Sequence, residues 1–311
     1  MTGRSEIAVP VTTAEIRRAR RLVQPIRRWW AGTRAERDRL PWRGTRDPWH
    51  VLVAETMLAQ TQVARVAPRF REFVARFPTP ASCAVAPLGE VVRAWIGLGY
   101  NRRALALHTA AEEIVRAHGG RVPSALSELE DLNGVGPYTA RAVMALAFNA
   151  RVAAVDTNVG RVLSRAGLAR RLLPSEVQAV ADGLIPAGSA RAWNLALMDF
   201  GSLVCRARRP ACVACPVRAA GACAWRAAPR GVPDPAVGSA RVTSRQSRFE
   251  GSDRQGRGRL VRAACAGPIA PGEVAAIAGW PTQDGRAHRV AEALCAEGIL
   301  VHGRSGELSL A

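Results

Sequence analysis

Apolar residues recur at helical spacing along almost the whole chain, and this periodicity restricts the possible folds more than any other feature of the sequence. Alternating runs of β-branched residues, the pattern of half-buried strands, are nearly absent before residue 298. We therefore predict an all-α body. Helices are expected after Asp47-Pro48, after Gly99, after Gly136, after Asp156 and over roughly residues 190–204.

The C-terminal part of the chain has a different pattern. Residues 229–255 lose the periodicity and are rich in Pro, Gly, Ser and Arg, which predicts a linker. Three helical segments follow near residues 256–265, 271–278 and 284–297, and two short strands around a glycine-containing turn are expected after them. Three helices and a hairpin predict a small winged-helix-like module over residues 256–311.

The charge of the chain is strongly positive. The formal net charge is +19, and all 44 basic residues are arginine. An excess of this size indicates a polyanionic partner. Residues 1–46 hold twelve arginines against four acidic residues, and residues 1–27 are predicted to form a basic arm that follows phosphates or stays solvated.

No membrane partner is expected from this sequence. No apolar run approaches the roughly 18 residues that a membrane-spanning helix needs. The N-terminal residues lack the apolar core of a signal peptide. We expect a monomer in the cytoplasm, associated with the nucleoid.

A glycine hairpin, LNGVGPYT, occupies residues 132–139. Gly134 and Gly136 allow a sharp turn that aims backbone N–H groups outward at the start of a helix, a geometry that binds phosphate. Asp156 follows in the apolar segment AAVD, where an isolated carboxylate is costly to bury unless it has partners or a chemical role. The alternative is a simple glycine turn and a helix capped by Asp156.

Four of the seven cysteines lie close together at the end of the predicted helical body, with the spacing C-x6-C-x2-C-x7-C. These are Cys205, Cys212, Cys215 and Cys223. Four clustered thiolates can hold zinc or a [4Fe–4S] cluster, and the presence of a single C-x2-C pair favours the iron–sulfur cluster. The other cysteines are scattered in apolar segments, as is typical of buried thiols in a reducing compartment.

The hairpin, an aspartate about twenty residues later and a four-cysteine loop together resemble the helix-hairpin-helix DNA glycosylases that carry an iron–sulfur cluster. Within that superfamily the chain resembles the adenine DNA glycosylases. The resemblance implies a glycosylase domain over residues 28–228, with the cluster loop at 205–223. It rests on LPWR at 40–43, ETMLAQTQV at 55–63, GLGY at 97–100, GVGPYTA at 134–140 and VDTNV at 155–159.

The resemblance implies a monofunctional enzyme that flips out and hydrolyses adenine mispaired with 8-oxoguanine or guanine in double-stranded DNA. It assigns to Glu55 the protonation of adenine N7, and to Asp156 the stabilisation of the cationic sugar. Tyr138 and Asn158 are expected to form hydrogen bonds around Asp156. Apolar neighbours of Glu55 predict burial that keeps it available as an acid; the alternative is a glutamate on a solvated helix face.

DNA contacts are implied for a further set of residues. Gln60 resembles the wedge that fills the gap left by a flipped base, and Leu98 and Tyr100 resemble an intercalating tip. Gly134 and Gly136 would hold a phosphate, with a monovalent cation on the hairpin carbonyls. Each of these residues also has an ordinary interpretation, as surface amide, core side chain or turn glycine.

Position 138 bears on the type of reaction. The related endonuclease III enzymes use a lysine in the hairpin helix to form a Schiff base with the sugar, and the corresponding position here is Tyr138. Because the chain contains no lysine, a lysine-based strand-cleaving activity is not expected.

The chain departs from the adenine glycosylase pattern in several places. Ala59 precedes Gln60 where two glutamines are common, Asn101 replaces a second tyrosine, and the last cysteine gap is seven residues instead of five. The tail is too short and too helical for the Nudix-like domain that reads 8-oxoguanine in many relatives. Open alternatives are a glycosylase that removes thymine or uracil opposite guanine, a non-catalytic damage-binding protein, and a redox or transcription factor.

Overall fold

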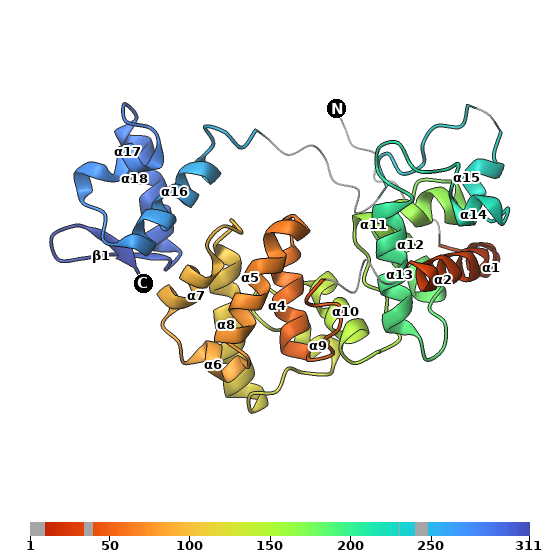
Figure 1. The fold of residues 1–311 in the computed structure, drawn as a ribbon, viewed down its shortest axis with the longest axis horizontal. Coiled ribbons are helices and arrows are strands. Elements are labelled where there is room, and N and C mark those ends of the chain that lie inside the picture. The colour runs from red at the N-terminus through yellow and green to blue at the C-terminus, as the bar shows by residue number, and fades with distance from the viewer. Residues whose placement is uncertain (1–9, 34–39, 230, 240–247) are drawn as a thin grey trace. The chain divides into compact units, whose positions relative to one another are not determined.

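Figure 1 shows the computed structural model of the chain, which describes residues 10–33, 40–229, 231–239 and 248–311. Positions 1–9 of the predicted arm and positions 230 and 240–247 of the predicted linker lie outside the described residues. The described residues are mostly helical and include one two-stranded sheet, which confirms the all-α prediction. None of the described helices combines the length and hydrophobicity needed to cross a membrane.

The chain forms two compact units, each built from two separate stretches of sequence. Unit 1 contains the described residues of Met1–Arg39 and Pro137–Arg245, and unit 2 contains those of Leu40–Gly136 and Gln246–Ala311. The predicted glycosylase domain over residues 28–228 therefore contributes to both units.

Unit 1 packs around a helical core. Its elements are α1 (Thr13–Ala19), the 3₁₀ helix η1 (Arg20–Leu22), α2 (Val23–Gly32), α10 (Pro137–Leu146), α11 (Thr157–Val162), the π-helix η2 (Leu163–Leu168), α12 (Pro174–Gly183), α13 (Ala190–Leu203), α14 (Pro216–Ala219) and α15 (Ala224–Ala227). Trp193 and Phe200 of α13 are fully buried at its centre. The helices expected after Gly136, after Asp156 and over 190–204 are confirmed.

The described part of the predicted basic arm belongs to this core. Ala19, Leu22 and Ile26 are buried against residues of α11 to α13. Their spacing of three and four residues places them on one helix face, so this segment contributes an apolar surface and is not a solvated arm. The boundary expected at residue 27 lies inside α2.

Part of the predicted linker also packs on unit 1. The carboxylate of Asp234 accepts hydrogen bonds from the nearly buried guanidinium of Arg165, with an Nε to Oδ1 distance of 2.8 Å. The Ser239 hydroxyl accepts a bond from the Leu172 N–H at 3.2 Å. Residues 231–239 are therefore an extension of unit 1. Polar side-chain contacts hold this segment, which the apolar periodicity of the sequence does not reveal.

The first part of unit 2 is a helical body. Its helices are α4 (Pro48–Leu58), α5 (Val63–Arg76), α6 (Pro80–Ala84), α7 (Leu88–Trp95), α8 (Arg102–His118) and α9 (Leu126–Glu130). Asp47 caps α4 by accepting a hydrogen bond from the His50 N–H at 2.9 Å, and Pro48 occupies the first helical position. The start of this helix is thus where the sequence predicts it.

The second part of unit 2 is the C-terminal module. It contains α16 (Asp253–Ala266), the 3₁₀ helix η3 (Pro271–Glu273), α17 (Val274–Ala278), α18 (Asp284–Ala296), β1 (Leu300–His302) and β2 (Leu308–Leu310). The two strands pair antiparallel, with Leu300 opposite Leu310. Three helices followed by a hairpin are the elements that the sequence predicts.

Candidate active site

Asp156 lies at the start of α11 in unit 1 and is held by two hydrogen bonds. Its Oδ1 accepts from the Val159 N–H and its Oδ2 accepts from the Asn158 side-chain amide, both at 2.7 Å. The first contact is a helix cap, so the structural interpretation of Asp156 is correct. The second confirms the expected contact with Asn158. The cap is compatible with a chemical role, because it fixes the carboxylate in one orientation.

Burial raises the pKa of Asp156. The hydrogen bonds from Val159 and Asn158 and the positive charge of Arg161 act in the opposite direction without cancelling this effect. A poorly solvated carboxylate interacts strongly with any positive charge that develops beside it. Asp156 is therefore suited to stabilise a cation, provided that it is ionised.

Arg161 is a functional candidate that the sequence reasoning missed. Its side chain is 5% exposed and connects three parts of unit 1. Nη2 donates to Asn158 Oδ1 and to the Gly201 carbonyl at 2.6 Å each, and Nε donates to the Cys205 carbonyl at 2.7 Å. The Asp156 and Asn158 pair is thereby linked to the first cysteine of the quartet. The only sequence signal was an arginine five residues after the aspartate.

Gly201 explains how α11 and α13 approach closely enough for these contacts. A Cβ at this position would lie 2.7 Å from Asn158 Cβ and 2.8 Å from the Asn158 carbonyl oxygen. Both distances are too short for ordinary packing. Any larger residue at position 201 would therefore displace Asn158 and, through it, Asp156.

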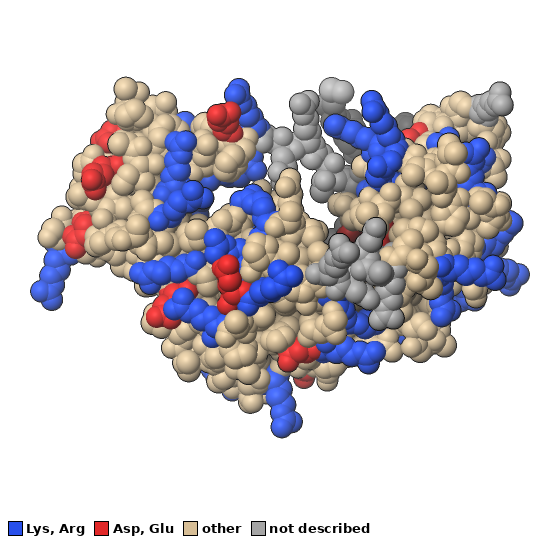
Figure 2. Space-filling view, in the orientation of Figure 1, with Lys and Arg blue, Asp and Glu red and all other residues tan. Residues whose placement is uncertain are grey.

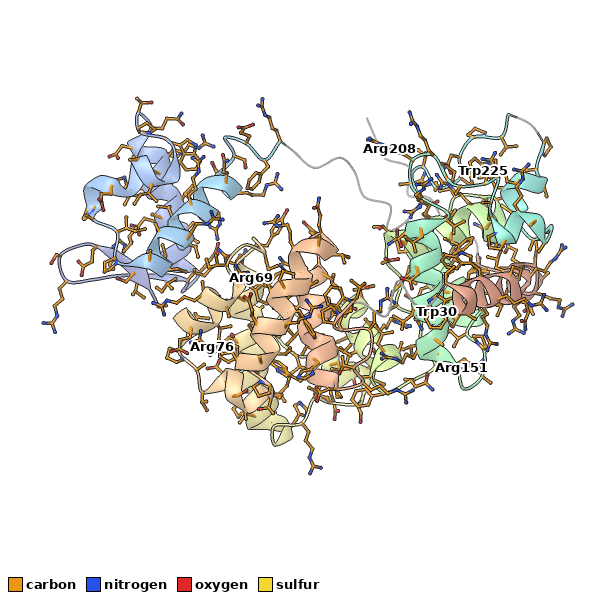
Figure 3. The ribbon with its side chains drawn as sticks, viewed as in Figure 1. Trp30, Arg69, Arg76, Arg151, Arg208 and Trp225 are labelled. Carbon is orange, nitrogen blue, oxygen red and sulfur yellow. The ribbon has the colours of Figure 1, made fainter. Side chains whose placement is uncertain are left out.

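The four cysteines of the quartet line one pocket in unit 1. Arginine side chains reach two of the sulfur atoms: Arg165 Nη1 lies 3.8 Å from Cys205 Sγ, and Arg226 Nη2 lies 3.3 Å from Cys212 Sγ. Trp225 packs beside the pocket, with the guanidinium of Arg226 4.2 Å from its ring centroid. The loop also carries the exposed Arg208, labelled with Trp225 in Figure 3.

The spacing of the sulfur atoms tests what this quartet can hold. No three of these described cysteines have sulfur atoms that all lie within 4.8 Å of one another. Thiolates about 2.3 Å from a tetrahedral zinc ion would be only about 3.8 Å apart. In a [4Fe–4S] cluster each thiolate binds a different iron atom, so a wider arrangement fits. A set of four thiols around one pocket therefore fits a [4Fe–4S] cluster, and the sulfur atoms as placed do not close around a single ion.

Glu55 lies in unit 2, in the last turn of α4, and is 8% exposed. Leu52 and Met57 on the same helix are fully buried. The prediction of a buried carboxyl group is confirmed, and the alternative of a solvated helix face is wrong.

Two short segments of unit 2 have the unusual backbone geometry expected of functional sites. Gln60 and Tyr100 adopt left-handed conformations, with φ angles of 57° and 51°. Such angles are strained for residues other than glycine and are concentrated at functional sites. Tyr100 is 40% exposed and available to a ligand, whereas Leu98 is 2% exposed. Leu98 thus lies in the core, and an intercalating tip formed by both side chains does not match this conformation.

Arg103 connects these two segments and is the second residue that the sequence reasoning missed. Its side chain contacts both the end of α4 and the loop before α8, and its guanidinium lies over the rings of Trp95 and Tyr100. Burial lowers its pKa to about 10. The guanidinium donates at 2.6–3.0 Å to the carbonyls of Thr56, Met57, Ala59 and Gly99 and to the Thr61 hydroxyl.

The glycine hairpin begins in unit 2. Gly134 has a φ angle of 72°, and a Cβ there would lie 2.6 Å from the Ala106 Cβ of α8, so only glycine fits. Gly136 has open space around it. Phosphate binding by this hairpin stays a prediction.

The predicted site residues are divided between the two units. Unit 1 holds Tyr138, Asp156, Asn158 and the cysteine quartet, and unit 2 holds Glu55, Gln60, Leu98, Tyr100, Gly134 and Gly136. The structure brings Asp156 and Asn158 into direct contact. Tyr138 is partly buried in the first turn of α10.

Comparisons with known proteins identify the family to which the chain is similar. Residues 53–187 match the HhH-GPD superfamily of base excision DNA repair proteins. The chain is 42% identical over 285 residues to an adenine DNA glycosylase from Mycobacterium tuberculosis, and the alignment covers 89% of this chain and 90% of that protein.

Two solved structures resemble the fold. A thermostable thymine-DNA glycosylase superposes with a TM-score of 0.61 and 31% sequence identity, covering 68% of this chain and 98% of the other. A non-covalent endonuclease III–DNA complex superposes with a TM-score of 0.58 and 26% identity, covering 69% of this chain and 96% of the other.

Proposed function

The chain belongs to the adenine DNA glycosylase family, and on this basis we propose that it is a monofunctional glycosylase of base excision repair that removes adenine mispaired with 8-oxoguanine or guanine. The observation that carries the proposal is Asp156, a half-buried carboxylate held by the Val159 N–H and the Asn158 amide. A purely structural cap would not require a poorly solvated carboxylate in place of an asparagine.

The proposed reaction uses two carboxyl groups in different roles. Glu55 donates a proton to N7 of the flipped adenine, the bond between C1′ and N9 breaks, and its electron pair stays on the departing base. Asp156, as carboxylate, stabilises the positive charge that develops on the sugar. Water then adds to C1′ and loses a proton, which leaves an abasic site in an uncut strand.

Strand cleavage through a Schiff base is outside this proposal. Tyr138 occupies the position where the lysine of related enzymes is expected, and the chain contains no lysine. Borohydride treatment during the reaction should therefore trap no covalent complex with DNA.

We further propose that the cysteine quartet binds a [4Fe–4S] cluster. The four thiols line one pocket, and guanidinium groups of Arg165 and Arg226 lie near two of them to offset negative charge. The cluster, when bound, would hold the 205–223 loop in one conformation. The exposed Arg208 on this loop then faces a polyanion such as DNA.

The proposed partner is double-stranded DNA that contains a mispair, bound by a monomer in the cytoplasm. The net charge of +19 supports a polyanionic partner. The chain is more similar to an adenine DNA glycosylase, at 42% identity, than to a thymine-DNA glycosylase, at 31%, so removal of thymine or uracil opposite guanine is the less favoured alternative.

A panel of duplexes tests the proposal. Base release is measured from adenine paired with 8-oxoguanine, guanine or cytosine, and from G:T and G:U pairs, with and without alkali. We expect adenine release opposite 8-oxoguanine and guanine, with strand breaks only after alkali. Intact A-containing mispairs together with released thymine or uracil would favour the second candidate, and no release from any duplex would contradict both.

The role of Asp156 is tested in the same panel with a matched control. Asp156→Asn keeps a good helix cap and removes the charge, so base release should fall to background. Asp47→Asn makes the same change at the cap of α4, where no chemical role is proposed, and should release base normally. Equal activity of the two variants would refute the assignment of Asp156.

A further inference from the structure

A basic groove runs along the C-terminal module in unit 2. It has a volume of about 940 Å³ and lies between α16 and the loop that joins α7 to α8. The segment after α4, which contains Gln60, also lines it. Seven arginines line the groove, namely Arg65, Arg102, Arg103, Arg254, Arg257, Arg259 and Arg262.

The positive charge of this groove is largely uncompensated. Among the described residues that line it, Glu297 is the single acidic one. Its carboxylate pairs with Arg257 at 2.5 Å and lies 3.8 Å from Arg102. Arg259 and Arg262 are exposed on α16, and Arg259 Nη1 donates to the neutral carbonyl of Ala278 at 3.4 Å. Arginines gathered in this way, against one shared acid, favour an anionic ligand.

The module contacts the helical body of unit 2 at specific points. Arg254 Nη1 lies 3.0 Å from the hydroxyl of Tyr100, and the Gly89 N–H donates to the Ala311 carbonyl at 2.9 Å. A Cβ at Gly89 would lie only 2.9 Å from that carbonyl oxygen, so glycine permits the contact. In Figure 2, basic side chains gather on the module and on the body of unit 2 beside it.

We propose that this groove binds the sugar–phosphate backbone of the DNA next to the mispair, with α16 as a phosphate-binding wall. The inference rests on the proposed function, and it assigns a role to the C-terminal module. Gln60 and Tyr100, the two exposed side chains expected at the mispair, lie on the groove wall opposite α16. A duplex whose mispair contacts these residues has its neighbouring phosphates within reach of the α16 arginines.

The chemistry of the lining matches a phosphate backbone better than a small anion. Guanidinium groups bind phosphate through two parallel hydrogen bonds, and a row of them along a helix matches the regular repeat of charges on a strand. The lining also includes the exposed Phe249, whose ring offers a surface for sugar or base contacts. The groove is long enough for several phosphates because its lining residues extend from Phe249 to Arg262 along the module.

The salt dependence of DNA binding tests this inference. The double variant Arg259→Gln, Arg262→Gln removes two exposed charges from the groove. The matched control Arg289→Gln, Arg304→Gln removes two exposed charges from the same module outside the groove lining. The dissociation constant for a duplex with A opposite 8-oxoguanine is measured from about 50 to 200 mM salt, and circular dichroism confirms that each variant is folded.

Each lost phosphate contact lowers the slope of log affinity against log salt by about 0.9. We expect the groove variant to lose about 2 from the slope and to weaken binding of matched and mispaired duplexes by a similar factor, while the control keeps the wild-type slope. A wild-type slope in the groove variant, or an equal loss in both variants, would overturn the inference.

A second measurement changes the DNA and uses the same two proteins. Single phosphates on either side of the mispair are replaced one at a time by neutral methylphosphonates, and binding to the wild type is compared with binding to the groove variant. At the contacted positions the replacement should weaken wild-type binding several-fold and have little further effect on the variant. Equal losses at every position in both proteins would refute contact by α16.

Failure of this inference can be told apart from failure of the proposed function. If the wild type releases adenine but the groove variant keeps the wild-type slope and methylphosphonate profile, only the inference fails. If the wild type releases no base from any duplex, the proposed function fails, whatever the binding slopes show.

Discussion

Replacing Arg103 by methionine should separate base removal from overall folding. In unit 2 the guanidinium of Arg103 holds the end of α4, just after Glu55, to the loop that carries Tyr100. Methionine keeps most of the apolar stem and removes all five polar contacts. The segments that present Gln60 and Tyr100 would then lose their common anchor, although the helices themselves have separate hydrophobic contacts.

The magnitude follows from opposing contributions. Hydrogen bonds from a charged donor contribute roughly 1.5–3 kcal/mol each, and five of them in one group do not add fully. Burial opposes them, because it lowers the pKa of Arg103 to about 10, well below the ordinary value of an arginine side chain. At 1.36 kcal/mol per pKa unit this corresponds to about 3 kcal/mol, less for the solvent-exposed part of the group. We expect the free energy of unfolding to fall by about 2–4 kcal/mol.

Thermal unfolding and single-turnover base release with saturating enzyme measure the two effects. The control is Arg116→Met, which removes an exposed arginine from the same helix. We expect Arg103→Met to lower the single-turnover rate about 10- to 100-fold at temperatures where both variants are folded, and Arg103→Lys to recover part of the rate. A rate equal to that of Arg116→Met, at any loss of stability, would refute a positioning role for Arg103.

The remaining predictions concern unit 1. Burial raises the pKa of Asp156, so above pH 3.8 the folded state binds more protons than the unfolded state, and the stability of the fold decreases as the pH rises through the folded pKa. The melting temperature of Asp156→Asn should therefore rise relative to that of the wild type between pH 4 and pH 7. For the same reason, wild-type base release should decline on acidification at a pH above the ordinary range of aspartate, and a rate independent of pH from 4 to 7 would contradict an ionised Asp156. Arg161→Met should cost about 2–4 kcal/mol of unfolding free energy and lower base release, whereas the exposed Arg151→Met should change neither. Cys215→Ser should reduce the iron and sulfide content of the purified protein at least two-fold. If the variant keeps the iron content of the wild type, and the wild type contains one zinc ion per chain, the cluster is excluded.

Local signals in the sequence predicted the helical elements well. Asp47 followed by Pro48 defines the start of α4, because a capping carboxylate and a residue without an N–H are both favoured there. The three helices and hairpin of the C-terminal module have regular apolar spacing and glycine turns. The first helices were less predictable, since a high density of arginine hid the apolar positions 19, 22 and 26 that pack in unit 1.

Side-chain contacts between distant segments could not be predicted in this way. The sequence interpretation treated Asp156 as either a helix cap or a functional carboxylate, but the structure shows that a cap can also orient the group. For Leu98 it left open an intercalating tip or a core side chain, and the side chain is buried, in a loop whose flanking glycines have positive φ angles. Neither result depends on the residue type alone.

The number of arginines in the chain does not by itself show how many of them are available to bind DNA. Arg103, Arg161 and Arg165 are largely withdrawn from solvent, and their guanidinium groups connect backbone carbonyls from separate segments. A lysine donates from a single nitrogen, whereas the five N–H groups of a guanidinium are spread over three nitrogens in a fixed plane, so arginine is suited to connect carbonyls of separate segments. Part of the net charge of +19 is thus structural, and only exposed arginines, such as those along α16, can be reached by a polyanion. Replacing a buried arginine should therefore lower the free energy of unfolding first. Replacing an exposed arginine of the groove should instead lower the salt dependence of DNA binding first.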